Sequence, residues 1–143
     1  MKKARFAFII LILMTGITLS SCKKTYEYEF MQPVENITSI AFVYADPYHD
    51  VDYSKLEIDC VIVNDLWPVF LEDFGEIPCK RYRFDPPNDV SGDVIRISYE
   101  DGSCEVFSAS SSLQIDAKGR QHYTMKYFDT DAFEQLVQKY YAG

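Results

Sequence analysis

The sequence predicts an α+β domain with a largely antiparallel sheet that carries helices on one face. Several segments of strand length alternate apolar and polar residues, and two segments repeat apolar residues at helical spacing. One helical segment lies inside the chain and the other at its C-terminal end. The 143 residues, 48% hydrophobic and 15% aromatic, suffice for the core of one domain. The expected order of elements is β-β-α-β-β-β-β-β-α.

Two strands are predicted in the first half of the domain. Residues 37–45 are rich in β-branched and aromatic side chains, and Ile40, Phe42 and Tyr44 would share one face. Residues 55–63 alternate more regularly, which is typical of a half-buried strand. The apolar side of that alternation consists of Leu56, Ile58, Cys60 and Ile62.

A short internal helix follows at about residue 65. Asp65 suits its N-cap, Pro68 is tolerated in its first turn, and Gly75 with Pro78 ends it. The expected apolar stripe of this helix is formed by Leu66, Phe70 and Phe74, widened by Trp67 and Leu71.

The clearest local signal is a hairpin at residues 94–108, after a strand at 79–84 and a polar loop. Asp101-Gly102 suits a two-residue type I′ turn. That turn would set Tyr99 opposite Cys104 and Ile97 opposite Val106 on an apolar face, with Arg96 opposite Phe107 and Ser98 opposite Glu105 on the other. The prediction therefore places Glu105 on the polar face.

A second hairpin and a helix complete the domain. Residues 113–128 would form two strands around a longer turn in which Gly119 takes a positive φ. Asp129 or Thr130 would then cap a C-terminal amphipathic helix. The one-sided apolar stripe of this helix consists of Phe133, Leu136, Val137, Tyr140 and Tyr141.

The first 22 residues form a separate unit. Lys2, Lys3 and Arg5 precede an unbroken apolar run from Phe6 to Met14, and small residues follow, which is the layout of a secretory signal peptide. The run is too short to span a bilayer, which takes about 18 or more apolar residues. Leu19-Ser20-Ser21-Cys22 resembles the lipobox of bacterial lipoproteins. The alternative is an ordinary secreted protein in which Cys22 forms a disulfide.

The resemblance implies that the Cys22 thiol receives a diacylglycerol and that the leader is removed just before this residue. Two acyl chains, palmitate in many such proteins, hold a protein stably on a membrane. We therefore expect a signal peptide at 1–21, a lipidated cysteine and tether at 22–36, and one α+β domain at 37–143. The tether is interpreted as an extended linker lying on the domain. The protein would lie on the cell membrane or the outer membrane and face away from the cytoplasm.

The net charge of the mature chain restricts the classes of partner that it is expected to bind. Three of the 14 Lys and Arg residues lie in the leader, so the mature chain carries 11 basic against 22 acidic residues, a net charge of −11. Such a surface repels nucleic acid and lacks a basic groove for a phosphate backbone. Besides the membrane, the expected partners are an envelope protein or a cationic ligand.

Two loops rich in oxygen ligands are candidate metal sites. The first contains Asp46, His49, Asp50 and Asp52, and the second contains Asp85, Asn88, Asp89 and Asp93. Their spacing fits no established metal-binding loop, so solvated turns are the favoured interpretation. No cofactor is predicted.

Three cysteines remain once Cys22 is acylated, an odd number that allows one bridge and one free thiol. A bridge between Cys60 and Cys79 would enclose the internal helix, while Cys60 and Cys104 fall on expected core faces where a free thiol acts as a small hydrophobe.

The sequence contains no catalytic motif that we can assign. His49 and His122 are its only histidines, and no Gly-x-Ser-x-Gly motif or phosphate-binding glycine loop occurs. We therefore expect a non-catalytic binding or interaction module. The alternative is a small envelope hydrolase whose acidic residues the sequence does not identify.

Overall fold

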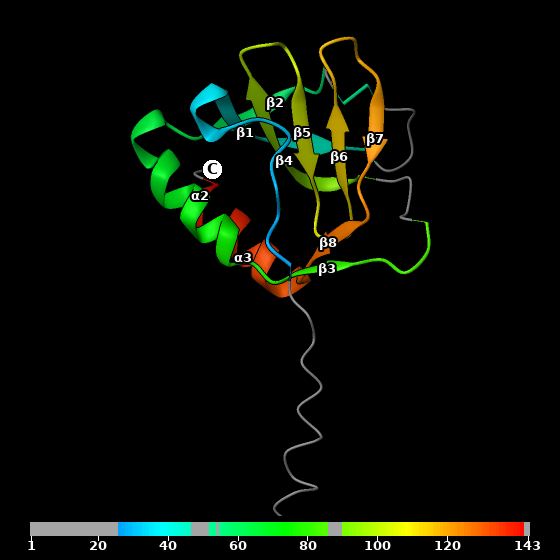
Figure 1. The fold of residues 1–143 in the computed structure, drawn as a ribbon. Helices are drawn as coiled ribbons and strands as arrows, with labels where there is room; N and C mark the ends of the chain where they lie inside the picture. Colours follow the sequence, from blue (N-terminus) through cyan, green and yellow to red (C-terminus); the bar gives the residue numbers. More distant parts are fainter. Residues whose placement is uncertain (1–25, 47–51, 54, 86–89, 142–143) are drawn as a thin grey trace, which may run out of the picture.

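The computed structural model describes residues 26–46, 52–53, 55–85 and 90–141, and it confirms the α+β architecture (Figure 1). A six-stranded antiparallel sheet has the order β2-β1-β4-β5-β6-β7, and a separate two-stranded sheet pairs β3 with β8. The large sheet consists of β1 (Ile37–Ala45), β2 (Ile58–Val61), β4 (Gly92–Tyr99), β5 (Cys104–Phe107), β6 (Ser112–Ile115) and β7 (Gln121–Tyr123). The remaining elements are β3 (Cys79–Arg81), β8 (Lys126–Phe128), α2 (Trp67–Glu76), α3 (Thr130–Tyr140) and the 3-10 turns η1 (Val34–Asn36) and η2 (Asn64–Leu66).

Both helices pack on the same face of the large sheet and enclose an aromatic core. Phe74 of α2 lies at its centre, with its ring centroid 5.0 Å from that of Phe107 on β5 and 5.3 Å from that of Phe128 on β8. Edge-to-face and tilted ring contacts of this kind stabilise a core beyond the area they bury. The same core also buries Ile40, Phe42, Phe70, Ile95, Ile97, Phe133, Leu136 and Val137.

The expected cap of the C-terminal helix is confirmed, whereas the cap of the internal helix is wrong. The amide of Ala132 donates to Asp129 Oδ1 at 3.2 Å. Asp65 instead lies inside η2, and the chain passes from this 3-10 turn directly into α2 with Leu66 at the N-cap and no side-chain cap bond. A helix that continues a preceding turn has less need of a side-chain cap, because that turn already bonds part of its first backbone groups.

The edge of the sheet also departs from the expected pattern. β2 spans four residues rather than 55–63, and its register with β1 shifts between Phe42 and Val43, which leaves Asp59 as an extra residue and turns Ile58 to the opposite face from Cys60. Ile58 is therefore 44% exposed. Tyr44 is 56% exposed, since it lies past the last β1 residue that pairs with β2. The expected strand at 121–128 is split into β7 and β8, which join different sheets.

The β4–β5 hairpin has a different turn from the predicted one. Only Gly102 has a positive φ, of 84°, whereas a type I′ turn needs positive φ at Asp101 as well. The Asp101 carboxylate instead accepts hydrogen bonds from the backbone amide and the hydroxyl of Ser103. The loop is therefore a three-residue turn that ends in a glycine bulge.

This turn shifts the pairing by one residue, and a shift of one residue reverses the faces. Ile97 pairs with Glu105 and Arg96 with Val106, contrary to the prediction. Glu105 and Phe107 consequently point to the helix-covered side, while Cys104 and Val106 belong to a second core on the opposite face. That second core also contains Val43, Tyr53, Val90, Val94, Leu113 and Ile115.

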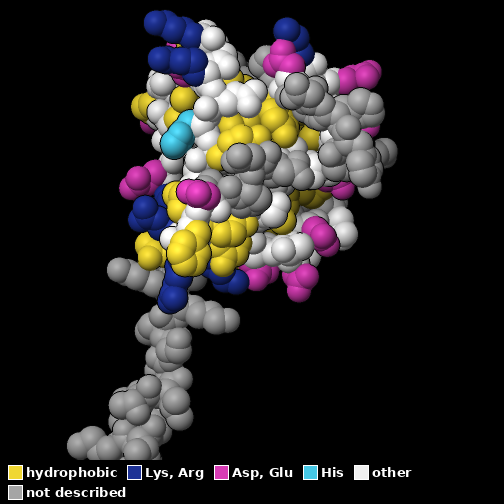
Figure 2. Space-filling view, turned by 90° about the vertical axis from the view of Figure 1, so that its right-hand side faces the viewer, with side chains coloured by type: hydrophobic (Ala, Val, Ile, Leu, Met, Phe, Trp, Pro, Cys, Tyr) yellow, Lys and Arg dark blue, Asp and Glu magenta, His cyan; other side chains and the backbone are white. Residues whose placement is uncertain are grey.

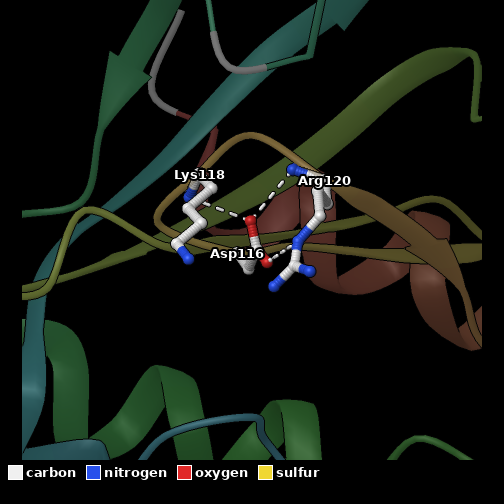
Figure 3. Close-up of polar contacts among 3 residues, drawn as sticks. All are labelled: Asp116, Lys118 and Arg120. Carbon is white, nitrogen blue, oxygen red and sulfur yellow. Dashed lines mark hydrogen bonds and ion pairs between the residues drawn. The ribbon is translucent and has the colours of Figure 1, made fainter.

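The β6–β7 turn is held by one carboxylate (Figure 3). Asp116 accepts bonds from the amides of Lys118 and Arg120, both at 2.9 Å, and from Arg120 Nε at 2.6 Å. The bond from the Arg120 amide is the main cause that lowers the pKa of the Asp116 carboxyl. Gly119 has the expected positive φ, of 80°.

Replacing Gly102 by Ala should destabilise the domain by about 1 kcal/mol, because a side chain disfavours the left-handed conformation of the turn. Gly75→Ala is the matched control. Gly75 is an exposed helical residue with free space around its Cα, so alanine there should be neutral or stabilise by up to about 1 kcal/mol. Urea unfolding measures the free energy of unfolding of both variants. Equal changes for the two substitutions would contradict the assigned turn.

Candidate functional site

Glu105 is the one charged side chain that is buried among the residues the structure describes, with 0% exposure. It lies on β5, and its side chain points to the helix-covered side of the sheet, as that of Phe107 does. A buried carboxylate is costly unless hydrogen bonds replace the water it has lost. Its environment is therefore a candidate functional site.

Four donors surround this carboxylate. Tyr28 Oη donates to Oε1 at 2.8 Å, Gln114 Nε2 donates to the same oxygen at 2.9 Å, and the amide of Met31 donates to Oε2 at 3.1 Å. Tyr99 Oη donates to Oε2 as well. Two donors for each oxygen use about all the acceptor capacity of a carboxylate. This arrangement leaves the group occupied by the protein itself, which indicates a structural role.

Both tyrosines donate their hydroxyl hydrogens to the Glu105 carboxylate. Burial raises the pKa of the Tyr28 hydroxyl far above its ordinary value, and the neighbouring Glu105 carboxylate raises it further. The pKa of Tyr99 is raised by the same causes in the same order.

The Glu105 network fixes the segment before β1. Tyr28 and Met31 belong to this segment, which packs against the core together with Phe30. The Tyr28 ring meets Phe107 edge to face at 5.0 Å, and the amide of Tyr26 donates to the carbonyl of Cys79 at 2.9 Å. The part of the expected tether that the structure describes therefore lies on the domain, and from Tyr28 onward it contributes to the core.

Two hollows lie on the surface of the described domain. The larger, of about 520 Å³, lies between α3, the start of β4 and the Ser108–Ser110 turn, and includes the carboxylates of Asp93 and Glu134. The second, of about 370 Å³, lies beside Tyr28 and includes Arg81, His122 and Lys126. His122 is exposed on β7 and pairs with Gln114, a donor to Glu105.

The structure describes only some of the candidate metal-binding residues. His49 and Asp50, with Asn88 and Asp89 of the second loop, lie outside the described residues. Asp52 is exposed and pairs with Lys55 Nζ at 2.8 Å. Within the described ranges, no group of three His, Cys, Asp or Glu side chains could hold a metal ion.

The three described cysteines are free thiols. Cys60 lies in β2 at the edge of the large sheet and Cys79 in the separate β3–β8 pair, so the proposed bridge is not formed in this structure. Burial raises the pKa of the Cys79 and Cys104 thiols, which makes them less reactive. Cys22 lies outside the described residues.

A series of exposed apolar side chains follows β2 and continues through η2 into α2. We call it the 58–69 surface, and its members are Ile58 (44% exposed), Val61 (51%), Val63 (60%), Leu66 (45%) and Val69 (48%). Glu57, Asp59 and Asp65 lie between or beside them, and no Lys or Arg occurs at 56–79. The outer edge of β2 carries no partner strand in the described sheet.

Comparisons with protein-family models, with curated proteins and with solved structures find no match to this chain. Among the described residues, no helix is long and apolar enough to cross a membrane.

Glu105 was not predicted to be buried, because its interior position depends on the turn at Gly102. The signal that could have found it is a single carboxylate in the otherwise apolar segment Cys104–Phe107. The exposure of the 58–69 surface was not predicted either, because Ile58 and Leu66 fit the expected core stripes of a regular strand and helix.

Replacing Glu105 by Gln should destabilise the domain by roughly 2 kcal/mol, because an amide offers one acceptor oxygen where four donors need two. Glu100→Gln on the same hairpin is the control, since Glu100 is exposed and should tolerate the change within about 0.5 kcal/mol. Urea unfolding measures the loss of unfolding free energy in each variant. Similar losses for Glu105→Gln and Glu100→Gln would contradict the network.

Proposed function

We propose that this chain is a lipid-anchored protein of the bacterial envelope that binds a partner protein through the 58–69 surface without catalysing a reaction. The observation that supports binding is the set of exposed apolar side chains along that surface. Five exposed apolar side chains within twelve residues of sequence are the kind of feature that an interaction site uses.

The charges around this surface favour a partner with apolar and basic residues. Glu57, Asp59 and Asp65 are exposed there, and the sequence between Lys55 and Lys80 contains no basic residue. Complementary charge speeds association and excludes acidic competitors, while the apolar contacts supply the affinity. The short, bulged and acidic β2 resists pairing with a further copy of the same strand.

The anchor would hold the domain close to the bilayer. Cys22 precedes Tyr26 by four residues, and Tyr26 is already bonded to β3. Four extended residues reach at most about 14 Å. Because Tyr28 and Met31 are fixed by Glu105, little slack separates the lipid from the folded domain. Either the cell membrane or the outer membrane fits this arrangement.

Replacing Cys22 by Ala should leave the leader uncleaved or release the protein from the membrane fraction, because two acyl chains supply the stable attachment. The wild-type protein should need detergent for extraction and should carry a diacylglycerol on its first residue by mass spectrometry. A wild-type protein that is soluble without detergent would contradict the anchor.

A photo-crosslinking residue at Val63 should capture a specific envelope protein in cells, and the added substitution Val69→Asp should reduce this product several-fold by charging the apolar surface. The same crosslinker at Lys118, an exposed residue of the β6–β7 turn, is the matched control. Equal products from both positions, or a product that Val69→Asp leaves unchanged, would contradict binding at this surface.

A further inference from the structure

The β3–β8 pair and its continuation have a charge opposite to that of the whole protein. Residues 79–84 and 125–128 contain Lys80, Arg81, Arg83 and Lys126 but no carboxylate, on a mature chain of net charge −11. We call these two segments the basic ribbon. Lys23 and Lys24 lie between Cys22 and Tyr26 in the sequence, so six of the 11 mature basic residues belong to the ribbon or the link to the anchor.

Aromatic side chains are interleaved with these cations. Phe84 is 84% exposed, the largest exposure among the large hydrophobic residues described. The rings of Tyr82 and Tyr127 lie against each other with centroids 4.4 Å apart. Figure 2 shows Lys/Arg and hydrophobic side chains side by side at the lower end of the domain, the level at which Figure 1 places β3 and β8. Arg, Lys, Tyr and exposed Phe together are the residues that favour a membrane–water interface.

The first described residues of the chain, Tyr26 and Glu27, are bonded to the basic ribbon. The amide of Tyr26 bonds the carbonyl of Cys79, and Lys126 Nζ bonds the carbonyl of Glu27 at 3.0 Å. Lys80 lies 3.9 Å from Asp129, and no other carboxylate of the described residues pairs with a cation of the ribbon. Arg81 and Arg83 are exposed. Their guanidinium groups are therefore available to bind phosphates.

We propose that the basic ribbon docks on the anionic phospholipid surface that holds the anchor, with Arg81 and Arg83 binding headgroup phosphates and Phe84 entering the interface. This inference rests on the proposed lipid anchor. Each basic residue near an anionic surface adds to binding, and the contribution falls off within about 10 Å of the surface at moderate salt. The docked ribbon would orient the domain and turn the 58–69 surface away from the bilayer, since β2 lies toward the opposite end of the domain from β3 and β8 (Figure 1).

The test uses the intact lipidated protein with Phe84→Trp, reconstituted in vesicles of brominated phosphatidylglycerol or brominated phosphatidylcholine. Bromine quenches tryptophan only at close range, so Trp fluorescence should fall strongly in phosphatidylglycerol and little in phosphatidylcholine. The wild-type protein is the reference, because its only tryptophan, Trp67, is fixed on α2 by a 2.9 Å bond to the carbonyl of Ile62. Its fluorescence should be similar in both vesicles.

A charge reversal identifies the contact. Arg83→Glu in the Phe84→Trp background should lower the quenching several-fold, whereas Lys118→Glu, the same charge change on the distant β6–β7 turn, should leave it unchanged. Vesicle-bound protein with no quenching above the wild-type level would overturn the docking while leaving the anchor intact. Equal quenching in both lipids would overturn the assignment to anionic headgroups. Protein that does not float with vesicles would contradict both the anchor and the docking.

Discussion

The buried carboxylate of Glu105 joins the segment before the first strand to the centre of the sheet. It accepts bonds from β4 through Tyr99, from β6 through Gln114, and from the entering chain through Tyr28 and Met31. A carboxylate in an apolar core is stable only while such donors replace water, so release of the entering chain would deprive Glu105 of two of its four donors. The aromatic contacts of Tyr28 and Phe30 with Phe74 and Phe107 depend on the same placement.

Because the entering chain is fixed to the domain, the proposed anchor would also restrict the orientation of the domain on the membrane. A flexible tether would let the domain rotate freely above a bilayer, whereas a chain fixed from Tyr26 onward would hold the basic ribbon near the lipid. The acidic and apolar 58–69 surface, toward the opposite end of the sheet, would then face a partner rather than the membrane (Figure 1). One interaction in the core would thereby set which surface meets the membrane and which remains open.

Local patterns predicted the fold class, the strand at 37–45, both helices and the cap at Asp129, because each depends on periodicity or on side chains a few residues apart. The site could not be obtained in the same way. Asp101-Gly102 is compatible with two turns that differ by one residue, and the bonds from Ser103 to Asp101 favour the longer one. That single residue reverses the faces of β5 and places Glu105 in the helix-covered core instead of on the face predicted to be polar. The exposure of Ile58 likewise follows from a bulge, which periodicity does not reveal.

Amide hydrogen exchange at Met31 in the intact mature protein tests the account most directly. Met31 lies outside every helix and strand, and its amide has Glu105 Oε2 as its acceptor. If the carboxylate holds the entering chain, this amide should exchange as slowly as amides of β4 and β5. Exchange at the rate of an unstructured peptide, with β4 and β5 still protected, would show that the segment is free and would contradict the central claim.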